Sequence, residues 1–149
     1  MKEKILEALR ELGFELEEIG GNAYGFQYEG RNYLYVHTEE DEDFLNITLP
    51  AVMEMEDEND VCFYQIMDKI NSTLKYVKAN VFNDSMWLSY ERELFGGEDL
   101  KQVIGRMIIH LDAGLYFLRR LMADLNDDDE TETDVTDLDT DTDGEGEAA

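Results

Sequence analysis

A long stretch with helical periodicity, residues 98–125, constrains the fold of this chain more than any other feature. At roughly 100° per residue, one broad side of such a helix is apolar. That side carries Leu100, Val103, Ile104, Met107, Ile108, Leu111, Leu115, Phe117, Leu118, Leu121, Met122 and Leu125. With a rise of about 1.5 Å per residue, the helix would be roughly 40 Å long, the span of a small domain. The stretch therefore predicts a long C-terminal helix against which the rest of the chain packs.

The chain before this helix alternates short helical and extended segments. Apolar spacing predicts helices over residues 2–12 and 59–73, and strands over residues 24–28, 31–37, 44–49, 76–82 and 86–90. We expect the third strand to end at Pro50, the only proline, and two-residue turns at Glu29-Gly30 and Asn83-Asp84 to close two hairpins. The order α-β-β-β-α-β-β-α predicts an α+β domain, with an antiparallel sheet and helices packed on one face.

The strands have two contrasting faces, which suggests a role for one of them. The two-residue turns predict the cross-strand pairs Tyr24–Tyr35, Phe26–Tyr33, Ala79–Leu88 and Val81–Met86. One face then collects the aromatic residues Tyr24, Phe26, Tyr28, Tyr33, Tyr35, Phe44 and Tyr76. We expect the helices to cover the opposite, aliphatic face and to leave the aromatic face half exposed or covered by something else. Because tyrosine-rich surfaces suit recognition, the candidate partner-binding residues are Tyr24, Phe26, Tyr28, Tyr33 and Tyr35.

Charge excludes some classes of partner. The 149 residues carry a net charge of −25, and residues 126–149 alone hold twelve acidic and no basic side chains. Residues 1–125 hold 25 acidic and 12 basic side chains, so this part is also acidic, at −13. Nucleic acids and anionic membranes are disfavoured partners because both bind through Lys and Arg. The acidity favours a solubility role, with the steering of basic partners as the alternative.

Length and composition suggest one domain, residues 1–125, followed by a disordered acidic tail, residues 126–149. The tail has too few apolar residues to offset the entropy of ordering. The single cysteine, Cys62, excludes an intrachain disulfide. Charges at the start of the chain do not fit a signal peptide, and no apolar run is long enough to span a membrane. We therefore expect a cytoplasmic protein.

The residues give no sign of catalysis or of a cofactor. His37 and His110 have no Cys or His three or four positions away, and no nucleophile motif is present, so we expect a protein without enzymatic activity. Gly96-Gly97 could suggest a phosphate-binding turn, but Glu98 and Asp99 follow at once. These two acids suit the positive end of a helix dipole and would repel an anion, which favours capping.

A calcium-loop pattern occurs in the acidic tail. Asp139, Asp141 and Asp143 stand before Gly144 in the order D-x-D-x-D-G, and Glu147 occupies the ninth position. The twelfth position, which should be a bidentate Glu, lies beyond residue 149. Alternating Asp and Thr produce this pattern by chance, so weak and diffuse cation binding is favoured over a true calcium loop.

The rear of the predicted long helix is a second place for a partner. Opposite the main apolar side lie Gly105, Ile109, Asp112, Tyr116 and Ala123, with Arg106, Arg119 and Arg120 beside them. Ile109 and Tyr116 are candidate partner-binding residues there, since a solvated face does not need them. The alternative is an ordinary solvent face with scattered apolar residues.

These features together resemble the type III secretion chaperone-like fold and, within it, the YbjN family of candidate sensory-transduction regulators. The resemblance covers residues 1–125 and rests on the opening helix with Gly13-Phe14, the aromatic hairpin from Tyr24 to Tyr35, the strand ending Leu49-Pro50 and the long last helix. It implies an acidic homodimer that binds peptide segments or other proteins without catalysis.

Our leading hypothesis is therefore a homodimeric protein-binding module of the chaperone-like, adaptor or regulatory kind, with an unidentified protein or peptide client. Two alternatives stay open. One is a calcium- or cation-responsive protein acting through the tail. The other is an acidic decoy for basic or nucleic-acid-binding partners.

Overall fold

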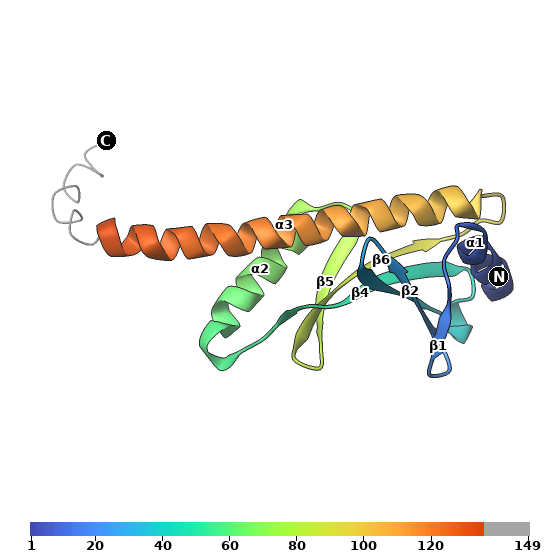
Figure 1. Ribbon diagram of the computed structural model, residues 1–149, viewed down its shortest axis with the longest axis horizontal. Helices are drawn as coiled ribbons and strands as arrows, with labels where there is room; N and C mark the ends of the chain where they lie inside the picture. The colour runs from blue at the N-terminus through green and yellow to red at the C-terminus, as the bar shows by residue number, and fades with distance from the viewer. Residues whose placement is uncertain (136–149) are drawn as a thin grey trace.

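The computed structural model describes residues 1–135, with the side chains of residues 1–126, and shows an α+β fold (Figure 1). The helices are α1 (Lys2–Glu11), α2 (Asp60–Thr73) and α3 (Leu100–Val135), with two 3-10 turns, η1 (Glu39–Asp41) and η2 (Asp57–Asn59). The strands are β1 (Glu17–Ile19), β2 (Ala23–Tyr28), β3 (Arg31–Val36), β4 (Phe44–Glu54), β5 (Val77–Phe82) and β6 (Ser85–Glu93). They form one antiparallel sheet in the order β1-β2-β3-β4-β6-β5.

Both predicted hairpins are confirmed, including their registers. Tyr24 pairs with Tyr35 and Phe26 with Tyr33, and in the second hairpin Ala79 pairs with Leu88 and Val81 with Met86. Glu29 and Gly30 have φ values of 53° and 76°, and Asn83 and Asp84 of 52° and 59°. Two successive positive φ values are typical of the type I′ turn, whose twist matches that of the flanking strands.

The largest differences from the sequence-based expectation concern three elements, β1, β4 and α3. The short edge strand β1 was not expected, because two of its three residues are glutamates and no alternation marks it. β4 does not end at Pro50: it continues to Glu54, and its pairing with β6 shifts between Leu49 and Met53, where Ala51 has φ of 50°. A bulge of this kind accommodates a residue that has no N–H to donate.

The third difference concerns the last helix. We expected it to end at Leu125, and α3 instead continues to Val135. Elongation of an existing helix adds one hydrogen bond per residue without a new nucleus, so a polar stretch can extend it. The prediction of disorder for the rest of the tail concerns residues 136–149, which lie outside the described part of the chain.

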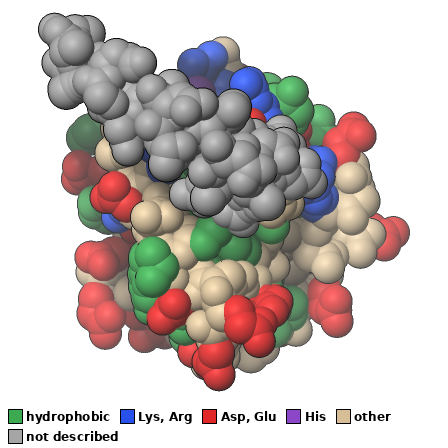
Figure 2. All heavy atoms as spheres, turned by 90° about the vertical axis from the view of Figure 1, so that its left-hand side faces the viewer, with side chains coloured by type: hydrophobic (Ala, Val, Ile, Leu, Met, Phe, Trp, Pro, Cys, Tyr) green, Lys and Arg blue, Asp and Glu red, His purple; other side chains and the backbone are tan. Residues whose placement is uncertain are grey.

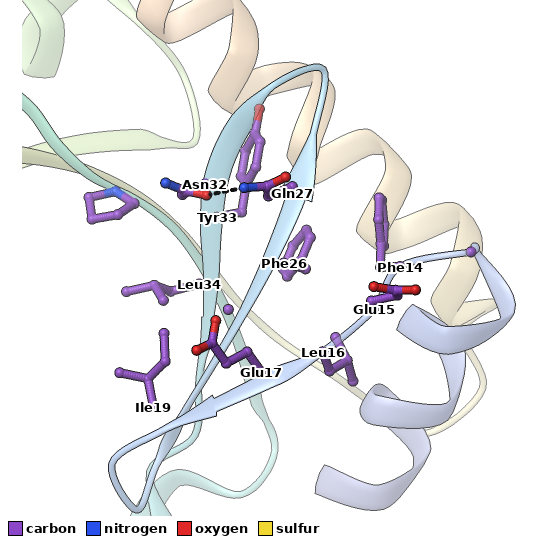
Figure 3. Close-up of a pocket in the computed structure, with 13 residues that line it drawn as sticks. Phe14, Glu15, Leu16, Glu17, Ile19, Phe26, Gln27, Asn32, Tyr33 and Leu34 are labelled. Atoms are coloured by element: carbon purple, nitrogen blue, oxygen red, sulfur yellow. Dashed lines mark hydrogen bonds between the residues drawn. The ribbon is translucent and has the colours of Figure 1, made fainter.

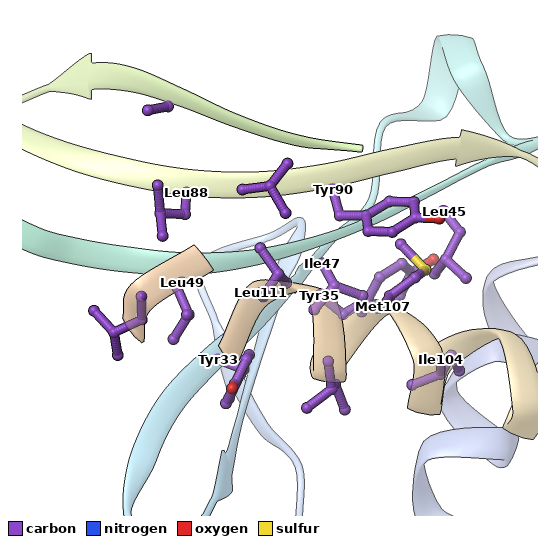
Figure 4. Packing of buried hydrophobic residues seen from close by; sticks show 14 of the residues in the cluster. Tyr33, Tyr35, Leu45, Ile47, Leu49, Leu88, Tyr90, Ile104, Met107 and Leu111 are labelled. Carbon is purple, nitrogen blue, oxygen red and sulfur yellow. The ribbon is translucent and has the colours of Figure 1, made fainter. Parts of the chain in front are cut away.

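The helices cover the aromatic face of the first hairpin, which corrects the assignment of the two faces. Tyr35 pairs with Ile47, and Ile47 with Tyr90, so the aromatic positions of β2 and β3 lie on the same face as the aliphatic positions of β4. Figure 4 shows these side chains around Ile104, Met107 and Leu111 of α3. Each large apolar side chain buried there contributes about 1.5–3 kcal/mol.

α3 crosses this covered face, with α1 near its start and α2 farther along (Figure 1). Gly114 lets the helix approach the sheet closely, since a Cβ atom at this position would lie 3.3 Å from Val77 Cγ1. Among the residues described, no helix has the length and apolarity required to cross a bilayer.

Candidate functional site

The aromatic residues predicted to bind a partner lie mainly in the core. Tyr33 and Tyr35 are 0% exposed and Phe26 is 3% exposed, whereas Tyr24 and Tyr28 are half-buried. The rings stack in pairs across the hairpin, Phe26 on Tyr33 at 5.6 Å and Tyr24 on Tyr35 at 6.0 Å between centroids. The expectation of a half-exposed recognition surface is therefore wrong for Phe26, Tyr33 and Tyr35, and only Tyr24 and Tyr28 stay partly exposed. The five rings fill the space between the sheet and the helices.

A polar contact joins the end of this hairpin to α3. Arg31 forms an ion pair with Asp112. Burial and the nearby Asp112 carboxylate raise the pKa of Tyr33 to about 12, and the Arg31 guanidinium partly opposes this shift. The pKa of Tyr35 is also raised, mainly by burial and secondly by the nearby Tyr24. Because both partners of the ion pair are partly exposed, it contributes only about 0–1 kcal/mol, and it serves mainly to position the hairpin against α3.

The second predicted surface is exposed. Ile109 is 63% exposed and Tyr116 is 66% exposed, on the side of α3 that points away from the sheet. We call this surface the α3 ridge, made of Gly105, Ile109, Tyr116 and Ala123 with Arg106, Arg119 and Arg120. Within residues 1–126, none of these three arginines takes part in an ion pair. In the end-on view of Figure 2, most of the visible Lys and Arg side chains lie in the upper half, on the α3 side.

The predicted cation site cannot be placed. Asp139, Asp141 and Asp143 lie outside the described residues. In the described part of the chain, no group of three or more His, Cys, Asp or Glu side chains is arranged to hold a metal ion.

The turn before α3 shows the predicted capping. Asp99 Oδ1 accepts a hydrogen bond from the backbone N–H of Gln102, at 3.3 Å, as an N-cap residue does. The Glu98 carboxylate turns back and accepts from the N–H groups of Phe95 and Gly96, at 2.8 and 3.0 Å, and from Arg92. These contacts, led by the Phe95 N–H, lower the pKa of Glu98.

The face of the sheet that the helices leave uncovered is a surface that the sequence reasoning missed. A groove of about 710 Å³ crosses it, and its apolar lining includes Ile19, Ala23, Leu34, Val36, Phe82 and Trp87. All of these side chains except Ala23 are large. The five large ones are neither part of the core cluster nor packed against it. We call this surface the open-face groove. The sequence contains a sign of this surface. Leu34 and Val36 alternate with the aromatic residues, and Trp87 stands between Met86 and Leu88, so both faces of these strands carry large apolar side chains.

Figure 3 shows how the first hairpin divides its side chains between the two faces. Phe14 and Phe26 lie on the helix side, with ring centroids 4.8 Å apart, while Ile19 and Leu34 point to the opposite side. Gly25 allows this arrangement, since a Cβ atom there would come within 2.9 Å of Ile19 Cδ1. The 780 Å³ hollow around these residues is thus divided between the two faces by the hairpin itself.

Apart from Ala79, the remaining lining of the open-face groove is polar. Asn46 donates to Glu91 Oε2 at 2.9 Å and accepts from Thr48 at 2.7 Å, and Lys78 Nζ lies 3.5 Å from Glu91 Oε1. A second hollow of about 230 Å³ adjoins the groove, shares Val36, Asn46 and Glu91 with it, and adds Asp41 and Phe44. The two hollows thus adjoin at these shared residues, and Asp41 makes the far end of this depression acidic.

This arrangement of sheet and helices is found in a solved structure. YbjN from E. coli, described as a candidate transcription regulator, superposes with a TM-score of 0.58 over 85% of this chain and 93% of that chain. The chain has the fold of YbjN. At 12% sequence identity, the likeness concerns the fold alone. No protein family and no curated protein matches the sequence.

Proposed function

We propose that this chain is a non-enzymatic protein-binding module of the adaptor, chaperone-like or regulatory kind, which acts in the cytoplasm as a homodimer. The observation that carries the proposal is the α3 ridge. It presents Ile109 and Tyr116, two large apolar side chains that are each more than 60% exposed, on one side of a rigid helix. Burial of such residues at the centre of an interface is a frequent source of binding energy.

The surroundings of the two histidines support a role without catalysis. His37 is buried beside the Tyr35 ring, and His110 lies 5.1 Å from the Tyr76 ring and 5.9 Å from the Tyr90 ring, centroid to centroid. Both imidazoles thus lie in aromatic packing, and His37 Nδ1 is 3.5 Å from the Tyr35 hydroxyl.

The likeness to YbjN supports a regulatory role exerted through proteins. YbjN is described as a candidate transcription regulator. Direct contact with DNA requires basic side chains to displace the counterions of the phosphates, and this chain has a net charge of −25. An acidic chain with this fold would therefore regulate through another protein.

The test is a double substitution in the α3 ridge, Ile109→Ser with Tyr116→Lys. It removes the apolar contacts and adds a charge, so we expect the dimer dissociation constant to rise at least roughly a hundredfold. Sedimentation velocity of the full chain over a range of concentrations measures this change. The matched control is Val61→Ser with Tyr64→Lys, a similar exposed pair on α2 that should leave the mass unchanged. A wild-type monomer at all concentrations, or a dimer that survives the ridge substitutions, contradicts this interface.

A further inference from the structure

The open-face groove contains large apolar side chains, although no helix in the described part of the chain covers it. An antiparallel sheet with one solvated face normally alternates apolar residues inward with polar residues outward. Here Leu34, Val36 and Trp87 occupy outward positions of β3 and β6. Ile19 and Phe82 extend this surface at its borders, at 48% and 54% exposed. Large apolar side chains gathered on an uncovered face are typical of interaction sites.

Trp87 adds a polar requirement to this surface. Its indole Nε1 is buried and has no hydrogen-bond partner among the described residues. The Phe82 ring packs edge-on against the indole, with 5.1 Å between centroids. A buried indole N–H normally has an acceptor, so this donor without one is unusual and marks the Trp87 end of the groove.

The charges around the groove select the chemistry of its occupant. The depression ends at the exposed acidic loop of residues 39–43, in which all five residues are Asp or Glu, and Asp41 lines it. Among the described residues, Lys78 is the one cation lining the groove, and Glu91 already pairs with it. A cationic occupant is therefore attracted and an anionic one repelled. The chain's own acidic tail and an anionic membrane are therefore disfavoured as occupants.

The geometry points to the open-face groove as the docking site for a basic amphipathic helix of a partner protein. The strands β2, β3, β4, β6 and β5 are neighbours, and the four spacings between them, at about 4.8 Å each, add up to about 19 Å. This distance matches the length of a helix of roughly 13 residues. The apolar side of that helix lies on Leu34, Val36 and Trp87, and its Lys or Arg side chains face Asp41 and Glu91. This inference rests on the proposed protein-binding function and names the partner class and a surface separate from the α3 ridge.

The test uses the single tryptophan as the probe, in the full chain. A synthetic 14-residue peptide of Leu and Lys, with Leu at helical spacing, is titrated while the emission of Trp87 is recorded. We expect a saturable shift of the emission and an affinity that falls at least about tenfold between 0.05 and 0.5 M salt. Two control peptides, one with Glu in place of Lys and one with the leucines distributed around the helix, should bind at least about tenfold more weakly.

Two groove variants separate the apolar from the charged contribution. Leu34→Ser with Val36→Ser should weaken binding at least about tenfold, because the apolar contacts are lost. Asp41→Asn with Glu91→Gln keeps the shape of the groove and should weaken binding severalfold and flatten the salt dependence. Circular dichroism confirms that each variant is folded. The α2 variant Val61→Ser with Tyr64→Lys, which lies outside both the groove and the α3 ridge, should bind the peptide as the wild type does.

Several outcomes would overturn the inference. They are a Trp87 signal that does not saturate, equal binding of the Glu peptide, and binding that survives both groove variants. A shift of Trp87 emission with protein concentration alone, abolished by the groove variants, would identify a second copy as the occupant and would also overturn it. Loss of peptide binding with an intact dimer rejects the groove and not the ridge, so the two proposals fail separately.

Discussion

Single side chains do specific structural work in this protein, and Glu98 is a clear example. Its carboxylate gathers two backbone N–H groups and the Arg92 guanidinium, and so shapes the turn from which α3 starts. Tyr33 and Tyr35 show the opposite case, in which burial penalises the charged form of a side chain. These opposite pKa shifts predict opposite responses of stability to pH.

We predict that Glu98→Gln lowers the thermal midpoint at neutral pH. The folded-state pKa of Glu98 lies below its ordinary value of 4.5, so its stabilising effect is present above pH 4.5. The effect is lost as the pH falls through the lowered pKa. Thermal unfolding of wild type and variant at pH 7 and at about pH 3 should therefore show a difference that shrinks in acid. A constant difference would show that the charge of Glu98 is not the cause.

At alkaline pH we predict unfolding linked to Tyr33. The pKa of Tyr33 is raised from 10.0 to about 12 in the folded chain, so its contribution to stability is complete below pH 10 and is lost between pH 10 and 12. Denaturant unfolding at pH 9 and pH 11 measures the loss. Tyr33→Phe should reduce this dependence, whereas Tyr64→Phe, at an exposed position on α2, should not. Equal slopes for both variants would contradict the prediction.

At the scale of elements, the two edges of the sheet are protected in different ways. β1 is three residues long and carries two glutamates, which discourages pairing with another chain. β5 is longer, and the Asn71 side chain of α2 pairs with its outer edge. Asn71 Nδ2 donates to the Ala79 carbonyl at 2.9 Å, and the Ala79 N–H donates to Asn71 Oδ1 at 2.6 Å. The amide thus takes the place of a neighbouring strand.

We predict that Asn71→Ala destabilises the fold by about 1–3 kcal/mol, because two partly buried hydrogen bonds are lost. The freed edge of β5 should also increase aggregation on heating. Urea unfolding and light scattering measure the two effects. Ser72→Ala on the same helix is the control, since Ser72 is exposed and its substitution should change stability by less than about 0.5 kcal/mol. Equal behaviour of the two variants would show that Asn71 does not protect the edge.

At the scale of the whole molecule, charge repulsion is the dominant electrostatic feature. A net charge of −25 on 149 residues opposes compaction, since folding brings the carboxylates closer together. The basic residues are few, and the α3 ridge holds three of the twelve. The protein therefore has the basic α3 ridge on one side and, on the face of the sheet opposite the helices, the open-face groove with its acidic end.

We predict that salt stabilises this protein. Raising NaCl from about 0.02 to 0.5 M shortens the screening length to a few ångströms, so the thermal midpoint should rise by several degrees at pH 7. At about pH 5, where part of the carboxylates is protonated, the same salt change should have a smaller effect. Differential scanning fluorimetry at both pH values measures this. A midpoint that is insensitive to salt at pH 7 would show that the repulsion is relieved locally.

What the sequence determined by itself is the local part of the structure. The helix period of residues 98–125 and the turn residues Glu29-Gly30 and Asn83-Asp84 depend on neighbours a few positions apart, and the hairpin registers followed from them. The same reasoning indicated the exposure of Ile109 and Tyr116. Only the tertiary structure decided which face of the sheet the helices cover. Because a one-residue shift moves every side chain to the other face, the pairing of β3 with β4 across residues 37–43 determined that outcome. That long-range pairing buries Tyr33 and Tyr35 and leaves Leu34, Val36 and Trp87 on the open face.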